Sequence, residues 1–482
     1  MNEIDLQTIE QEEDTLSRKS EFFQIDFLKA VMIFLVIFDH CVSWNIKSNI
    51  AVALWERISI PVFLVILGFN MGHSFREKGL TTLKQLYSWS YFKKKFMRYI
   101  VPFLILYAAS TFIGLFMYGF DFIAMYDTQY YPSHGVVNLF YLILPFWGPG
   151  NWFIPVLIQS ILVIPLLYWV FTKNSVLALI LTFAIEIVMQ VIVFFLFGGG
   201  FTSWEEVHMY SLFSNSILFY LSAVGLGMWF SKNHDLQHNR NFFMWILYPI
   251  SLAFIVAYQF FGYRIMIDGN RFLRGDYTLM VFPYSAFLVL VALKLLPKRW
   301  DNWFAKRISI IGKSTYHILL TQILGYGMIT AFWGTHYIID VPFDPSDILN
   351  NIINLVTLWV AFIWFGTIWR KIDQQEDLKR RILYYLNFFI IFPCIFLFTF
   401  WAQEFWVPIP LIAIILYAIA VVIRTYAIKR PSSIGEVCIW TGFLLISFIS
   451  MILQVTVVLP SEHWILLIPM AAYLIIVFFV TR

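Results

Sequence analysis

Residues 25 to 40 read IDFLKAVMIFLVIFDH, and they place four ionisable side chains in a run that is otherwise apolar enough to cross a bilayer. At about 100° per residue along a helix, Lys29 and His40 fall on one face, and Asp26 lies about 40° from His40 around the axis. Burying ionisable groups at membrane depth costs free energy, so such groups usually line a bundle interior or a wet cavity. This stretch therefore predicts a membrane helix that carries a functional path.

The composition of the whole chain agrees with a membrane location. Of the 482 residues, 60% are hydrophobic and only 13% are charged, far from the mix of soluble domains. Apolar runs near twenty residues recur along the chain, and they predict an all-α, polytopic bundle of about 14 transmembrane helices. The spans are expected near residues 22–43, 55–73, 99–119, 151–171, 175–198, 208–230, 241–261, 277–296, 309–334, 347–371, 383–402, 406–425, 434–456 and 463–481.

One highly charged connection, RKIDQQEDLKRR at 370–381, suggests where the chain divides. We expect a cytoplasmic tail at 1–21, a ten-helix body at 22–371, a charged linker at 372–382 and a four-helix extension at 383–482. The tail is acidic and polar, without the basic start and short apolar core of a signal peptide, so it is interpreted as retained.

The distribution of basic residues predicts the orientation. With the N-terminus inside, only four of the 33 lysines and arginines fall in outer loops, namely Lys47, Arg264, Arg271 and Arg274, while Arg57 lies within a helix. Positive charge concentrates on the cytoplasmic side of membrane proteins. Both termini are therefore expected in the cytoplasm, in a chain integral to the plasma membrane.

Residues 74–98 combine basic residues with Leu, Tyr, Trp and Phe. This segment indicates either an interfacial amphipathic helix leading into a basic cluster or plain anchoring beside anionic headgroups. The three cysteines all lie within apolar runs, so neither a disulfide framework nor a CxxC metal site is expected.

Distance along the first helix separates the roles of its polar residues. Asp26 and His40 are about 21 Å apart along the axis. Asp26 can pair with Lys29 at the cytoplasmic mouth, whereas His40 lies near the outer leaflet. Its orienting carboxylate is either Asp39 or a residue of another helix. Alternatively, His40 is an ordinary interfacial histidine at a helix end, and Lys29 only extends its ammonium group to the lipid headgroups.

The first helix resembles that of the acyltransferase-3 family of membrane O-acyltransferases, in which a basic residue, ten intervening residues and a histidine follow one another. Lys29 through His40 has that spacing, with lysine in place of the commoner arginine, and Ile25-Asp26 matches the usual start. IPVFLVILGF at 60–69 is similar to the family's P-x-F-F-x-x-S-G-F stretch, although Leu67 stands where serine is usual.

Three further segments carry the resemblance through residue 371. They are KKKFMRYIVP at 93–102, similar to a basic R-x-x-R-x-x-x-P segment; GNWFIPVL at 150–157, similar to a W-F-x-x-x-L helix start; and GKSTYHILLTQ at 312–322. The last resembles G-x-x-S-x-x-I-Y-L-x-H, with Leu319 replacing tyrosine and Gln322 replacing histidine. The four C-terminal helices lie outside the resemblance.

The resemblance implies transfer of an acyl group, by default acetyl, from cytoplasmic acyl-CoA to a hydroxyl of an extracytoplasmic glycan or related acceptor. Lys95, Arg98 and Lys29 would supply positive charge for the phosphates of acetyl-CoA. The pantetheine arm would thread the bundle over about 16 Å to His40, which would act as general base or form an acyl-histidine. No metal is expected.

Other polar and aromatic residues on the outer side are candidates for the acceptor. Trp152 is either a platform for a sugar ring or an ordinary interfacial tryptophan. Arg271 and Arg274 either bind an acidic acceptor or a lipid phosphate, or pair with Asp268 and Asp276. His134 is a further outer candidate, and Gln322 is expected to do no more than hydrogen-bond.

A transporter or flippase for a polysaccharide or a lipid-linked substrate is the rival interpretation, with the polar face of the first helix lining its path. Alternating access commonly rests on internal repeats and interrupted helices, and neither is evident in the sequence. A purely structural or sensory protein is a third reading. Expected partners are the acceptor glycan or lipid-linked sugar and membrane lipids, not nucleic acid; a homo-oligomer is left open.

Overall fold

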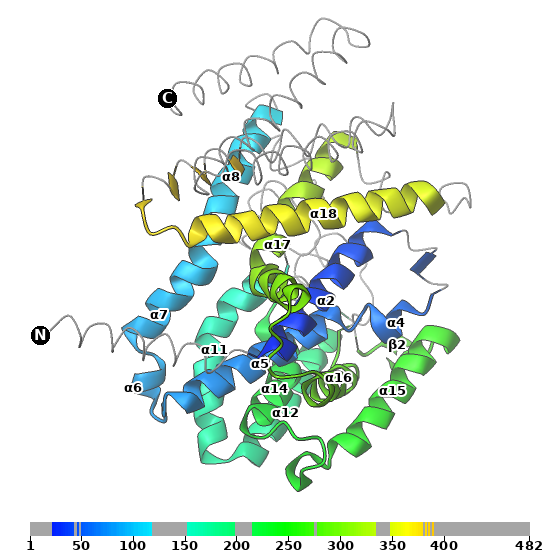
Figure 1. The fold of residues 1–482 in the computed structure, drawn as a ribbon. Coiled ribbons are helices and arrows are strands. Elements are labelled where there is room, and N and C mark those ends of the chain that lie inside the picture. Colours follow the sequence, from blue (N-terminus) through cyan, green and yellow to red (C-terminus); the bar gives the residue numbers. More distant parts are fainter. Residues whose placement is uncertain are drawn as a thin grey trace, which may run out of the picture. The chain divides into compact units, whose positions relative to one another are not determined.

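The computed structural model describes residues 22–42, 46–47, 50–117, 152–197, 215–273, 277–333 and 348–378, with a few positions between 381 and 389 (Figure 1). The chain divides into two compact units, Met1–Arg370 and Lys371–Arg482. The elements are α2 Phe23–Cys41, α4 Val52–Trp55, α5 Ser59–Glu77, α6 Leu83–Leu86, α7 Trp89–Lys95, π-helix η1 Phe96–Ile100, α8 Val101–Met117, α11 Phe153–Lys173, α12 Ser175–Phe197, 3-10 helix η2 Ile217–Tyr220, α14 Leu221–Lys232, 3-10 helix η3 Asn239–Asn241, α15 Met244–Phe261, β1 Met266–Ile267, β2 Asn270–Arg271, α16 Phe282–Leu295, α17 Trp303–Trp333 and α18 Ile348–Asp373.

The expected helical architecture is confirmed for the described residues. A helix occupies each of the ten intervals predicted between residues 22 and 371. Four helical stretches there are long and apolar enough to cross a membrane: Val52–Glu77, Phe153–Lys173, Ser175–Phe197 and Asn239–Phe261. The predicted four-helix extension falls largely outside the described residues, so the total of about 14 spans stays a prediction.

Helices α2, α5, α14 and α17 form the interior of the first unit, where α2 packs against α5 and α17, and α14 packs against α5. Glycines allow the closest of these contacts. A Cβ on Gly227 of α14 would stand 1.9 Å from the Val65 carbonyl oxygen of α5, and one on Gly68 of α5 would stand 2.0 Å from that of Val224. Backbones approach this closely only where small residues line the seam.

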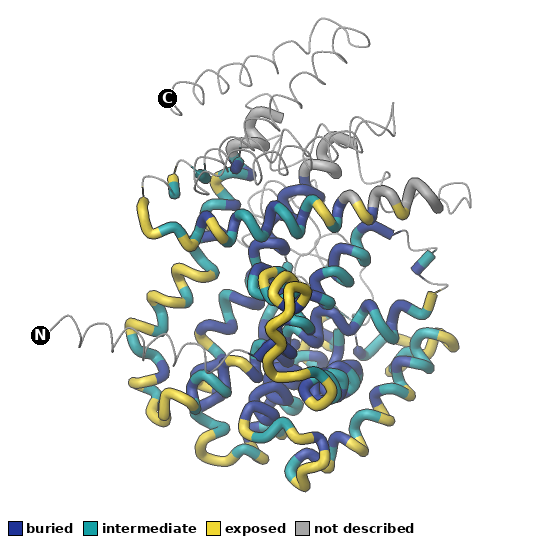
Figure 2. Tube along the Cα trace, in the orientation of Figure 1, coloured by how far each residue is buried: buried dark blue, intermediate teal, exposed yellow. Residues whose placement is uncertain are grey.

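Helices α12 and α15 present apolar side chains to the outside. Ile180 and Phe195 of α12 are 59% and 79% exposed, and Phe261 at the end of α15 is 82% exposed. Figure 2 shows exposed and half-buried residues along most of α15. Because a soluble protein rarely exposes so much contiguous apolar surface, these faces are suited to contact lipid.

The basic segment before α8 forms two short helices and a π turn rather than one amphipathic helix. Pro102 has no N–H to donate to the carbonyl of Arg98, which weakens the helical ladder where η1 occurs. The hydroxyl of Tyr91 in α7 donates to the carbonyl oxygen of Ile161 at 3.0 Å. Pro165 leaves that carbonyl without its usual helical donor, so a tyrosine fixes α7 against α11.

Candidate functional site

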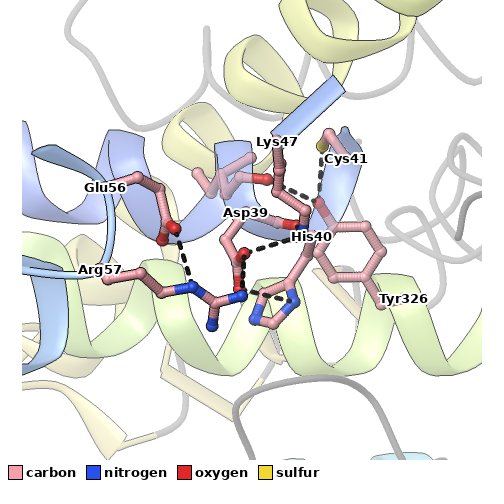
Figure 3. Close-up of polar contacts among 8 residues, drawn as sticks. Asp39, His40, Cys41, Lys47, Glu56, Arg57 and Tyr326 are labelled. Carbon is pink, nitrogen blue, oxygen red and sulfur yellow. Dashed lines mark hydrogen bonds and ion pairs between the residues drawn. The ribbon is translucent and has the colours of Figure 1, made fainter. Parts of the chain in front are cut away.

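Charged residues surround His40 at the C-terminal end of α2 (Figure 3). Lys47 donates to the Asp39 carboxylate at 2.9 Å and to the Asp39 carbonyl oxygen at 2.6 Å. An Arg57 nitrogen lies 3.7 Å from the same carboxylate, and another lies 3.4 Å from Glu56, whose side chain is buried. Two carboxylates and two cations therefore form an ion-pair network beside the imidazole.

The imidazole of His40 is partly exposed and is flanked by this network and by α17. Its Nδ1 lies 3.8 Å from an Asp39 carboxylate oxygen, which is too long for a hydrogen bond. The Tyr326 ring of α17 meets the imidazole edge to face at 5.8 Å between centroids. The Tyr326 hydroxyl lies 2.7 Å from the Cys41 sulfur and donates to the Ile37 carbonyl oxygen at 3.2 Å. Tyr326 thus holds the end of α2 against α17.

Gln322 lies one helical turn before Tyr326 on α17 and is fully buried. Neither its amide oxygen nor its amide nitrogen has a hydrogen-bond partner among the described residues. A buried amide without a partner costs free energy unless something else satisfies it. Gln322 thus keeps its full capacity to hydrogen-bond, close to Tyr326.

The other end of α2 carries the predicted pair of Asp26 and Lys29. Lys29 Nζ lies 2.8 Å from the Asp26 carboxylate, which confirms the pairing expected from their spacing. The hydroxyl of Ser309 in α17 donates to the second Asp26 oxygen at 2.6 Å. Gly312 packs directly on this turn, since a Cβ there would stand 2.0 Å from the Asp26 carbonyl oxygen.

The three cations predicted to bind acyl-CoA come together around Tyr99. Lys95 Nζ lies 5.5 Å and Arg98 Cζ 5.4 Å from the centroid of its ring, and Lys29 is within electrostatic range of its hydroxyl. Tyr316 of α17 donates to the Tyr99 carbonyl oxygen at 2.7 Å. Burial lowers the pKa of Lys95 below its ordinary value; nearby Tyr99 opposes this shift, while Arg98 and Lys94 add to it.

Trp152, the predicted sugar platform, precedes α11 and belongs to an aromatic cluster. Its ring stacks with Tyr277 at 5.9 Å between centroids and lies at a tilt 5.8 Å from Tyr220. These neighbours brace the indole between the start of α11, η2 and the segment before α16. The tryptophan is half-buried, so part of it remains open to contact.

Of the two outer arginines predicted to contact the acceptor, Arg271 lies on β2 and its Nε donates to the Leu273 carbonyl oxygen at 3.0 Å. Arg271 and Arg57 line one cavity. The structure thus places Arg271, which was predicted to contact the acceptor substrate, at the end of the bundle that holds His40. Arg274 and His134 lie outside the described residues.

Sequence reasoning missed a second buried polar group, Glu186 on α12. Its carboxylate is fully buried and accepts hydrogen bonds from the hydroxyl and the backbone N–H of Ser222 on α14. Thr182 and Gln190 lie one turn to either side, also buried. The sequence did contain a signal for this group, because Thr182, Glu186 and Gln190 recur every four positions within an otherwise apolar run.

Comparisons with known proteins assign the chain to a family. A model of the acyltransferase-3 family, described as an acyltransferase domain, matches residues 22–370. Neither the curated proteins nor the solved structures contain a match. The family model covers well over half of the chain, including both ends of α2. The chain therefore belongs to the acyltransferase-3 family and is a membrane acyltransferase.

Proposed function

We propose that this protein moves an acetyl group from cytoplasmic acetyl-CoA to a hydroxyl of an extracytoplasmic glycan or lipid-linked sugar, with His40 as the general base. The observation that carries the proposal is the arrangement along α2. A cluster of three cations surrounds Tyr99 at one end, and His40 lies about 16 Å further along the same helix.

The cation cluster supports binding of the donor. The head of CoA is rich in phosphates, and phosphates are recognised by charge-assisted hydrogen bonds from lysine and arginine. Arg98 is exposed and Lys95 is half-buried, so one is open to approaching phosphates and the other is placed deeper. Lys29, which is paired with Asp26, would mark the entrance to the interior.

His40 suits the chemical step. A neutral imidazole takes the proton of the acceptor hydroxyl while the hydroxyl oxygen attacks the carbonyl carbon of the thioester. The tetrahedral intermediate then collapses with cleavage of the C–S bond. The proton on the imidazole is passed to the leaving thiolate of CoA. The alternative order, through an acyl-histidine, uses the same side chain as a nucleophile.

Removing the charges of Lys95 and Arg98 tests the donor site. In the double variant Lys95→Gln and Arg98→Gln, the KM for acetyl-CoA is expected to rise about 10- to 100-fold per lost contact, because hydrogen bonds to charged groups contribute about 1.5–3 kcal/mol. Rates would be measured on the full-length protein in membranes.

A donor without phosphates provides the sharper comparison. Acetyl-pantetheine should be used equally well by the double variant and the wild type, and Lys93→Gln, an exposed lysine of the same helix, should leave both donors unaffected. An equal loss with both donors would contradict a phosphate-binding role.

The transporter alternative differs in what reaches the cell surface. If acetyl transfer is the function, a mass spectrum of surface glycans from cells without the protein shows the glycans present but lacking acetyl groups. If glycans stop reaching the surface and the purified protein never consumes acetyl-CoA, the proposal is wrong.

A further inference from the structure

A cavity with about 460 Å³ of empty space, which includes its open mouth, lies beside Arg57. Residues of α4, the last turns of α15, the β1–β2 hairpin and the segment before α16 line it. Arg57 also contacts the Asp39 carboxylate next to His40. The cavity therefore adjoins the charged network around the imidazole.

Three arginines line the cavity, Arg57, Arg264 and Arg271, and none of the described lining residues is acidic. Arg57 is already paired with Asp39 and Glu56, so the charge offered to a ligand comes chiefly from the other two. The guanidinium of Arg264 lies 3.5 Å from the centroid of the Tyr258 ring and donates to the carbonyl oxygens of Tyr263 and Tyr258. These neutral partners fix its orientation while its positive charge is kept. A concave site of this kind favours a negatively charged group.

The hairpin explains how two arginines seven residues apart come together. Asp268 and Gly269 have φ values of 49° and 77°, as the turn of a two-residue hairpin requires. Met266 then pairs with Arg271, and Phe272 N–H donates to the Ile265 carbonyl oxygen at 2.8 Å. The open end of the hairpin holds Arg264 and Arg271 on the same cavity.

Thr278 supplies an independent sign of a ligand. It lines the cavity and is 2% exposed, and its hydroxyl has no hydrogen-bond partner among the described residues. Burying a hydroxyl unsatisfied costs free energy. An anionic oxygen in the cavity would accept that hydrogen bond.

We propose that this cavity binds an oxyanion of the acceptor, either a sugar carboxylate or a phosphate, so that the enzyme acts on acidic acceptors. The inference rests on the proposed function and names its substrate class. Binding the charge here would hold the acceptor beside the network that flanks His40.

The test measures anion binding without catalysis. The full-length protein is purified in detergent, and its thermal unfolding is followed with added inorganic phosphate or glucuronate, with glucose and chloride at matched ionic strength as references. A ligand that binds only the folded state raises the unfolding temperature. We expect at least one of the two anions to raise it and glucose to have no effect.

Variants locate the binding. Arg264→Gln is expected to weaken anion binding about tenfold or more, and Thr278→Val several-fold. Thr278→Val should also leave the empty protein at least as stable, because it removes an unsatisfied hydroxyl, so a misfolded variant would be recognised. Arg240→Gln is the matched control, since Arg240 lies over Trp229 at 3.8 Å, away from the cavity.

The outcomes separate this inference from the proposed function. A rise in the unfolding temperature with phosphate alone indicates a phosphate-bearing acceptor. A rise with glucuronate alone indicates an acidic sugar. No shift with either anion, or equal shifts in wild type and Arg264→Gln, overturns the cavity's role even if the protein still consumes acetyl-CoA. Anion binding without any consumption of acetyl-CoA would instead overturn the proposed function.

Discussion

His40→Ala is expected to lower the rate of acetyl transfer by about 10²- to 10⁴-fold, the range that a positioned general base contributes. The imidazole is partly exposed; the Asp39 carboxylate lies 3.8 Å from its Nδ1, and the Tyr326 ring meets it edge to face. Its removal therefore takes away the chemistry and little of the packing. The measurement is the initial rate of CoA thiol release that depends on the acceptor.

A second histidine controls for effects on folding. His238 is exposed in the loop before η3, where its Nδ1 accepts the Arg240 N–H, and asparagine can take over that role. His238→Asn should keep the wild-type rate and unfolding temperature. If the His40→Ala variant has the wild-type unfolding temperature but still transfers acetyl at a rate within threefold of the wild-type rate, the general base lies elsewhere.

Local patterns were sufficient to predict a helix in each of ten intervals between residues 22 and 371 and one polar pair within α2. The pairing of Asp26 with Lys29 depends only on helical spacing and was confirmed at 2.8 Å. The expectation for Asp39 was less complete. It lies near His40, but its carboxylate is engaged by Lys47 and Arg57, which approach from outside the helix.

Contacts between distant segments could not be predicted from one sequence. Tyr326 contacts Cys41, although 285 positions separate them in the sequence, and no periodicity in either helix predicts that contact. The gathering of Lys29 and Lys95 around Tyr99 likewise depends on how α7 and η1 approach α2. These contacts follow from helix packing, which is set by side-chain shape over many residues rather than by local preference.

Gly312→Ala is expected to produce a large loss of stability. The new Cβ would stand 2.0 Å from the Asp26 carbonyl oxygen, 2.6 Å from its carbonyl carbon and 2.7 Å from its Cα. These are backbone atoms of the first turn of α2, which packs against α17, so they cannot rotate away as the end of a flexible side chain could. The gain in helix propensity, about 1 kcal/mol, is smaller than the cost of separating α17 from α2, which should be about 3 kcal/mol or more. Thermal unfolding of the purified protein measures the loss.

Two other substitutions show whether packing is the cause. Ser309→Ala removes the hydrogen bond to Asp26 from the same helix without adding atoms and should cost less than Gly312→Ala, about 1.5–3 kcal/mol. Gly79→Asn adds a side chain where nothing lies within 4 Å, and the left-handed backbone there should cost about 1 kcal/mol, less than the loss in Gly312→Ala. Since Asp26 holds Lys29, the Gly312 variant should also raise the KM for acetyl-CoA. Wild-type stability in Gly312→Ala would mean that α2 and α17 do not pack this closely, and the donor site built on their contact would have to be abandoned.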